Sequence, residues 1–289
     1  MAAVFKKEFK SSLFGMTGPI FIFAVLLILG FFTMFYVFVN ASTHFEYAIV
    51  DGAFWSLILT PVLTMRSFSE ERKSKTDQLL YSLPITGAQI VLGKYLAMVA
   101  VFAIPCAVSA VYPVIASFFA GGGMNFAICY GALLAYFLLG CALIAVCMLI
   151  SSLFESQVIV AILSLAVTLF LNFLSSVVSI IPTDPWVSVV ALAVIALVVA
   201  YIVYASTKNY IATAAVGVVL LAAIAVVYFI DSNLFVGLLA NMISSIFIFQ
   251  PISTFANGVF DITCFIYYLS IAALFVFVTV QSFERRRWN

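Results

Sequence analysis

The sequence has 289 residues, of which 66% are hydrophobic and only 8% are charged. A soluble domain carries about 25% charged residues, so no water-soluble fold hides this much apolar surface, and lipid must solvate much of the chain. The net charge of +1 indicates no particular partner, and no nucleic-acid partner is expected. The five cysteines form no CxxC pair and their number is odd, so we interpret them as small apolar packing residues. Neither a metal nor a cofactor is expected.

Apolar runs long enough to cross a bilayer recur along the chain. A spanning helix needs about 20 apolar residues, and the qualifying runs predict an all-α transmembrane bundle of eight spans. These are 17–39, 47–65, 89–118, 126–150, 157–181, 186–206, 210–230 and 262–282. Removing 186–206 and 210–230 together as a hairpin preserves the topology, so six spans is the alternative. Pro61, Pro105 and Pro113 predict kinks.

The basic residues predict the orientation. With a cytoplasmic N-terminus and eight alternating spans, all 12 Lys and Arg residues fall on the cytoplasmic side, which is the positive-inside pattern. Both termini are then cytoplasmic. Making the short apolar run 234–249 a ninth span would export Arg285–Arg287, so this run is predicted to be re-entrant or interfacial, within an outer segment 231–261. Pro251 is expected to end any helix there, and Asn257–Gly258 to provide the turn before the last span.

The N-terminal stretch 1–16 is amphipathic. Phe5, Phe9 and Leu13 recur at i, i+4 and i+8, and the lysines lie away from that stripe. This pattern predicts an interfacial helix on the inner leaflet, with lysines that reach anionic headgroups. The alternative is a plain cytoplasmic flank that sets the topology.

The cytoplasmic segment 66–94 is the only sizeable hydrophilic stretch. It is rich in charge at its start and then turns apolar. Thr76 or Asp77 is placed to cap a short helix of leucines, which Pro84 would stop, and Thr86–Gly87 would start the next span. The residues alone leave two interpretations open, a docking element for a soluble partner and a solvated connector.

This segment, RSFSEERKSKTDQLLYSLPITGAQIVLGKYLA, closely resembles the coupling region of ABC-2 type permeases. In that family a span ends in Arg and is followed by Glu-Glu/Arg, a Thr-acidic-Leu-Leu step, a Leu-Pro and a Gly-Lys that opens the next span. The matching positions are Arg66, Glu70, Glu71, Arg72, Thr76, Asp77, Leu79, Leu80, Leu83, Pro84, Gly93 and Lys94. Lys75 departs from the pattern, because the family usually has glycine there. The stretch Phe249–Trp288, with GVFD before the last span and RRRW after it, resembles the gliding-motility-associated (Gld-type) branch.

The resemblance implies a single ABC-2 type transmembrane domain over 1–289, with an elbow helix at 1–16, a coupling loop at 66–94 and outer re-entrant elements at 231–261. It implies that the coupling loop sits in a cleft of a separate cytosolic ATP-binding subunit. The contacting residues would be Arg66, Glu70, Glu71, Arg72, Thr76, Asp77, Leu80 and Pro84.

The same resemblance implies a second permease subunit, identical or related, in the cell inner or plasma membrane. Membrane lipids would surround the pair, and an accessory envelope subunit could join it. ATP would then drive the export or extraction of an amphipathic or lipid-like substrate.

The segment Gly87–Tyr95 superficially resembles a phosphate-binding P-loop. Its spacing is one residue too long and Tyr95 replaces the magnesium-binding hydroxyl, so this chain is not expected to be an enzyme, and ATP hydrolysis is expected on a partner. The spans hold almost no ionisable groups at their centres, which disfavours a secondary transporter. A membrane scaffold or assembly subunit of an envelope machine is the alternative that stays open.

Overall fold

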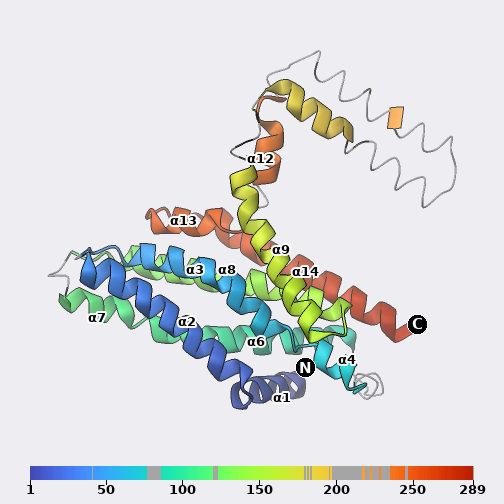
Figure 1. Ribbon diagram of the computed structural model, residues 1–289, viewed down its shortest axis with the longest axis horizontal. Coiled ribbons are helices and arrows are strands. Elements are labelled where there is room, and N and C mark those ends of the chain that lie inside the picture. The colour runs from blue at the N-terminus through green and yellow to red at the C-terminus, as the bar shows by residue number, and fades with distance from the viewer. Residues whose placement is uncertain are drawn as a thin grey trace. The chain divides into compact units, whose positions relative to one another are not determined.

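The computed structural model (Figure 1) describes residues 1–40, 42–76, 86–119, 123–178, 180, 182, 184–194, 196, 217, 218, 222, 228, 235–244 and 247–288. Its elements within these ranges are helices, and no strand occurs among them. The chain forms two compact units. Unit 1 comprises Met1–Phe170 and Ile248–Asn289, and unit 2 comprises Leu171–Phe247.

Six helical stretches in the described ranges, three of them made of two consecutive elements, are long and apolar enough to cross a membrane. They are Thr17–Val39, Phe45–Lys73, Gly87–Phe119, Phe126–Leu153, Gln157–Leu174 and Ile262–Arg285. Each coincides with a predicted span, so six of the predicted spans are confirmed. The other two, 186–206 and 210–230, lie largely outside the described residues, where only the shorter apolar helix Pro185–Val194 is described.

The chain begins with two helices that meet at a tight corner. The first elements are α1 (Ala2–Phe14), α2 (Thr17–Thr33) and the π-helix η1 (Met34–Val39). A Cβ at Gly15 would lie 2.6 Å from the Ser11 carbonyl oxygen, and one at Gly18 would overlap the Ser12 carbonyl. The corner between α1 and α2 therefore depends on glycine at both positions.

The next four elements bring the chain to the predicted coupling loop and out of it. They are α3 (Phe45–Thr64) and the five-residue helix α4 (Ser69–Lys73), followed by α6 (Gly87–Ser109) and α7 (Tyr112–Phe119). Thr86 caps α6, since its hydroxyl accepts a hydrogen bond from the Gln89 N–H at 3.3 Å, as the predicted helix start requires.

The predicted span 89–118 is divided between α6 and α7. Pro61 and Pro105 lie inside helices, whereas Pro113 is the second residue of α7. A proline in the first turn gives up no helical hydrogen bond, because that N–H has no partner in any helix. The helical run from Gly87 to Phe119 is thus interrupted at residues 110 and 111, directly before Pro113, where a kink was predicted.

Helix α8 (Phe126–Leu153) forms the centre of unit 1. It packs against α3, α6, α13 and α14. Close packing depends on Gly140, where a Cβ would overlap the ring of Phe102. The buried Tyr136 hydroxyl lies 2.8 Å from the Ser56 hydroxyl of α3, which satisfies both polar groups in an apolar interior.

The remaining helices are α9 (Gln157–Val178), α12 (Leu238–Ser244), α13 (Gln250–Ala256) and α14 (Ile262–Trp288). Pro251 lies in the first turn of α13, so it begins a helix where we expected it to end one. The predicted turn at Asn257–Gly258 is confirmed, because α13 ends there and Gly258 has φ +80°. Asp261 then accepts hydrogen bonds from the Thr263 side chain and backbone N–H, which lowers the pKa of its carboxyl. Within unit 2, the Leu239 N–H donates to Ser188 Oγ at 3.2 Å.

One end of unit 1 gathers α1, α4, the start of α6 and the end of α14 (Figure 1). We call it the charged end. Two observations fix the approach of α14 there: a Cβ at Gly87 would lie 2.8 Å from Glu284 Cγ, and the rings of Phe68 and Phe283 are 6.0 Å apart. The N-terminus, the start of the predicted coupling loop and the C-terminal end of the last span therefore meet at one end of the bundle.

Candidate functional site

The side chain of Lys94 is buried at the charged end, with 1% of it exposed. Its ammonium donates to the Ser67 carbonyl at 2.6 Å and to Glu8 Oε1 at 3.2 Å. It also lies 2.9 Å from Glu71 Oε2 and 5.1 Å from the centre of the Phe68 ring. Three oxygen atoms thus surround an ammonium group that has three N–H donors. Because every donor has an acceptor, the lysine can be buried in its charged form.

Lys7 completes the charge balance. Its ammonium donates to Glu71 Oε1 at 3.3 Å and lies 3.7 Å from Glu8 Oε1. The four residues Lys7, Glu8, Glu71 and Lys94, which we call the Lys94 cluster, carry two positive and two negative charges. They come from α1, α4 and α6, so the cluster joins three elements that are distant in sequence.

The Gly-Lys pair at the start of α6 has a geometric explanation. A Cβ at Gly93 would lie 3.1 Å from the Val4 side chain and 3.3 Å from the Met1 carbonyl oxygen. Glycine therefore lets α1 lie directly on α6. The adjacent Lys94 then reaches Glu8 of α1 and Glu71 of α4.

The joint between α3 and α4 is also held from the core. Phe68 is buried with Ile90, Phe283 and other apolar side chains. Its backbone N–H donates to Ser151 Oγ of α8 at 3.2 Å. The joint is thus fixed by α8 and α14 through packing and by α1 and α6 through ion pairs.

The predicted coupling residues take different environments. Arg66 and Glu70 are exposed, Glu71 is partly buried in the Lys94 cluster, and Arg72 is buried. Thr76 follows α4, and its hydroxyl donates to the Glu71 carbonyl at 3.2 Å. The structure therefore brings Arg66 through Thr76 together around α4. The other predicted residues, Asp77, Leu80 and Pro84, lie outside the described residues.

Lys75 adopts the left-handed conformation, with φ 55°. Its N–H donates to the Arg72 carbonyl at 3.0 Å, and the Thr76 N–H donates to the Glu71 carbonyl at 2.9 Å. These two bonds satisfy carbonyl groups at the C-terminal end of α4, as in helix ends that glycine usually closes. A conformation that usually favours glycine is therefore adopted here by lysine.

Sequence reasoning missed α4 and most of the Lys94 cluster. The signal for α4 was a first turn with Glu70 and Glu71 followed by basic residues, which suits the helix dipole. The signal for the cluster was a pair of isolated charges. Glu8 is the single acid in a basic stretch, and Lys94 is a lone cation within an apolar run.

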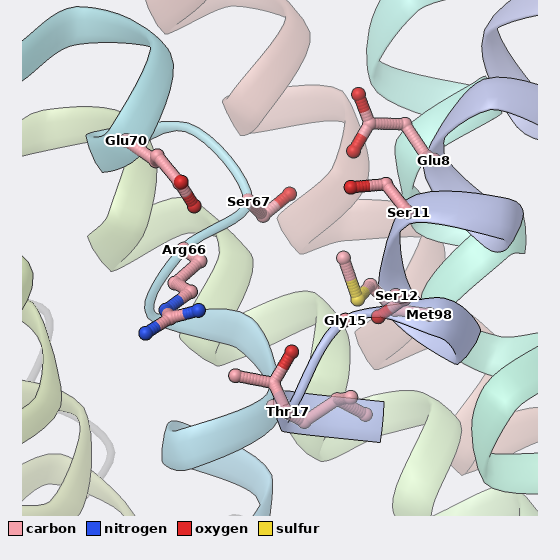
Figure 2. A pocket seen from close by; sticks show the side chains of 10 residues that line it. Glu8, Ser11, Ser12, Gly15, Thr17, Arg66, Ser67, Glu70 and Met98 are labelled. Carbon is pink, nitrogen blue, oxygen red and sulfur yellow. The ribbon is translucent and has the colours of Figure 1, made fainter. Parts of the chain in front are cut away.

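A polar cleft of about 230 Å³ lies beside the cluster. Figure 2 shows it between α1, the start of α2 and the α3–α4 joint. Its lining residues are Glu8, Ser11, Ser12, Gly15, Thr17, Leu63, Arg66, Ser67, Glu70 and Met98. We call it the Arg66 cleft.

The P-loop-like segment Gly87–Tyr95 is the start of helix α6 and forms no phosphate-binding loop. Its lysine is held by carboxylates of α1 and α4. Within the described part of the chain, no group of three or more His, Cys, Asp or Glu side chains gathers as a metal site.

The six apolar helices place this chain among the multi-pass membrane proteins. Residues 50–185 match the family described as ABC-2 family transporter protein. The matched stretch includes Glu71 and Lys94 of the cluster and runs from within α3 to beyond the end of α9. No curated protein matches the chain. The family match and the apolar helices together support a permease of the ABC-2 type.

Proposed function

We propose that this chain is the membrane-spanning permease subunit of an ATP-driven ABC transporter, and that the segment 66–94 docks on a separate ATP-binding subunit. One observation carries the proposal. Glu71, before the segment 77–85, and Lys94, after it, are 2.9 Å apart. The two stems of the coupling segment are therefore clamped to one another and to α1.

The clamp suits the transmission of force. Removing one partner of a buried ion pair costs about 3–5 kcal/mol, because the other charge is left without compensation, so separating these groups is unfavourable. A partner that pushes on 77–85 therefore moves α4, α6 and α1 together. Motion of α6 then reaches the bundle interior through the contact of α6 with α8.

The distribution of charge supports a cytoplasmic charged end. The basic residues of α1, the α3–α4 joint, α4, the turn after it and the start of α6 lie there, together with Arg285 of α14. The opposite end of unit 1 carries His44, Glu46 and Asp261. By the positive-inside rule, both termini would face the cytoplasm of the inner or plasma membrane. Lys208 lies outside the described residues.

The wider assembly follows from the resemblance. A second permease subunit, identical or related, would pair with this one, and 231–261 would close the outer end of the pathway between them. The stretch Phe249–Trp288 favours the Gld-type branch. An amphipathic or lipid-like substrate, exported or extracted from the membrane, is consistent with spans that have almost no central ionisable group.

Purification of the tagged full chain in mild detergent, with identification of every associated protein, tests this function. We expect an ATP-binding subunit to co-purify and to hydrolyse ATP. Leu80→Asp should abolish the association, because a carboxylate buried in the partner's groove would lack compensation. Leu80→Met, which keeps an apolar side chain, is the matched control. If Leu80→Asp still retains the ATPase, the loop is a solvated connector and not a docking element. If the wild type purifies without an ATPase, the proposal is refuted.

A further inference from the structure

The Arg66 cleft contains a buried hydroxyl without a protein partner. Ser67 is 3% exposed, and within the described residues nothing forms a hydrogen bond with its Oγ. Figure 2 shows this hydroxyl directed across the cleft toward Ser11 and Glu8. Burying a hydroxyl without a hydrogen bond is unfavourable, so a ligand atom in the cleft is expected to satisfy it.

The cleft offers separate sites for positive and negative charge. Arg66 lines it and has no described carboxylate within ion-pair distance. Thr17, the first residue of α2, is also part of the lining, and Met16 gives α2 no side-chain cap. The N–H groups of Thr17 and Gly18 in the first turn of α2 attract an anion, whereas Pro19 has no N–H. Glu70 supplies a carboxylate to the same cleft, whereas Glu8 is already paired with Lys94.

The cleft lies at one boundary of the membrane-spanning helices. It opens where α2 begins at Thr17 and just after α3 ends at Thr64. Both helices are apolar spans, so this level of the bundle coincides with the lipid headgroups. A lipid can therefore present its headgroup to the cleft while its acyl chains remain beside the spans.

We infer that the Arg66 cleft binds the zwitterionic headgroup of a phosphatidylethanolamine-type lipid. The phosphate lies against Arg66 and the first turn of α2, because both favour an anion. The primary ammonium lies against Glu70, and the hydroxyls of Ser67 and Ser11 complete its hydrogen bonds. Choline, which has no N–H donor, satisfies none of these acceptors. The lipid is a resident ligand of the α1–α2 corner and not the transported substrate. Arg66 and Glu70 also belong to the set expected to contact the ATP-binding subunit, but lipid retention by this chain alone is measured without that subunit.

Native mass spectrometry of the full chain in detergent tests this site, with phosphatidylethanolamine, phosphatidylcholine or phosphatidylglycerol of identical acyl chains as the probe. We expect phosphatidylethanolamine to be retained at least about tenfold better than the other two, since a charge-assisted hydrogen bond is at stake. Arg66→Gln should lower that retention about tenfold. Arg285→Gln makes the same change at an exposed position of α14 outside the cleft and should leave the retention unchanged.

Each other outcome overturns the inference. Equal retention of phosphatidylcholine would show that the cleft makes no hydrogen bond with a primary ammonium. Equal retention of phosphatidylglycerol would show that the cleft recognises only the phosphate. Displacement of the lipid by millimolar soluble phosphoethanolamine or inorganic phosphate would assign the cleft to a soluble ligand. Should Arg66→Gln fail to give a monodisperse protein, Glu70→Gln is the second variant. It must weaken phosphatidylethanolamine retention and leave phosphatidylglycerol retention unchanged.

Discussion

The ammonium of Lys94 lies 2.9 Å from the carboxylate of Glu71 and joins the two stems of the charged loop inside the protein. One residue belongs to α4, and the other lies within α6, after the segment that we expect to meet the ATP-binding subunit. Because Lys94 also holds Glu8 of α1, the same cation links the loop to the N-terminal helix. The cluster thus links these three elements by ion pairs, in addition to the packing of α1 on α6.

Replacement of Lys94 by Met should destabilise the protein by about 3–5 kcal/mol, because Glu8 and Glu71 would keep their negative charge in a largely buried site. Thermal or denaturant unfolding in detergent measures this loss. Lys10→Met, on the exposed side of α1, should cost less than about 0.5 kcal/mol. The double variant Lys94→Met with Glu71→Gln should recover about 1–3 kcal/mol relative to the sum of the single changes. Additive losses would contradict a direct interaction.

The apolar spans were predictable because lipid imposes a length and a composition on each helix. Their ends in the structure differ from the predicted ends by a few residues. The role of a single proline was harder to predict, since Pro251 begins a helix where it was expected to end one. A proline both breaks a preceding helix and fits the first turn of a following one, and sequence alone does not say which helix continues.

The Lys94 cluster was not predictable as a unit, although its members were visible. Glu8 and Lys94 are 86 positions apart, and only the packing of α1 on α6 brings them together. The predicted coupling set treated Glu70 and Glu71 alike. The structure separates them, because Glu70 is exposed whereas Glu71 is held by two lysines.

Gly93→Leu should displace α1 from α6, because even a Cβ at this position lies 3.1 Å from Val4. Overpacking of this kind costs about 1–3 kcal/mol. Protease accessibility of residues 2–14 should rise, which mass spectrometry of the released peptides detects. Gly93→Ala needs a shift of only a few tenths of an ångström and should give an intermediate effect. Unchanged protection in Gly93→Leu would show that α1 does not rest on α6.

Two glycines of α8 provide an internal comparison of packing. A Cβ at Gly140 would overlap the Phe102 ring, whereas one at Gly131 would lie 3.8 Å from Phe255. Gly140→Ala should therefore destabilise the protein by about 1–3 kcal/mol. Gly131→Ala should be neutral or stabilise by up to about 1 kcal/mol, since alanine favours a helix over glycine. The two unfolding midpoints should move in opposite directions or differ clearly, and equal shifts would contradict the close packing of α8 on α6.

Lys75→Gly should stabilise the turn after α4 by about 1 kcal/mol, because glycine adopts a positive φ without the steric cost that lysine bears. Lys73→Gly is the matched control. It removes the same side chain from within α4 and should destabilise by about 1 kcal/mol. Hydrogen exchange of the backbone amides of Ser74 and Thr76, which donate to carbonyls of α4, measures both changes. Faster exchange in Lys75→Gly would contradict a left-handed turn.

The orientation of the bundle is tested by labelling from the two sides of the membrane. All five native cysteines are buried, so the wild type should react little with a membrane-impermeant maleimide and serves as the background. Ser74→Cys, next to α4 at the charged end, should be labelled only when the reagent reaches the cytoplasmic face. Gly122→Cys, in the segment after α7, should be labelled from the outer face of intact cells.

The physical reason for this orientation is the cost of moving the lysines and arginines of the charged end across the bilayer. Labelling of both positions from the same side would contradict an odd number of crossings between them. Labelling of Ser74→Cys from outside would show that the charged end faces outward, where no cytosolic ATPase could dock.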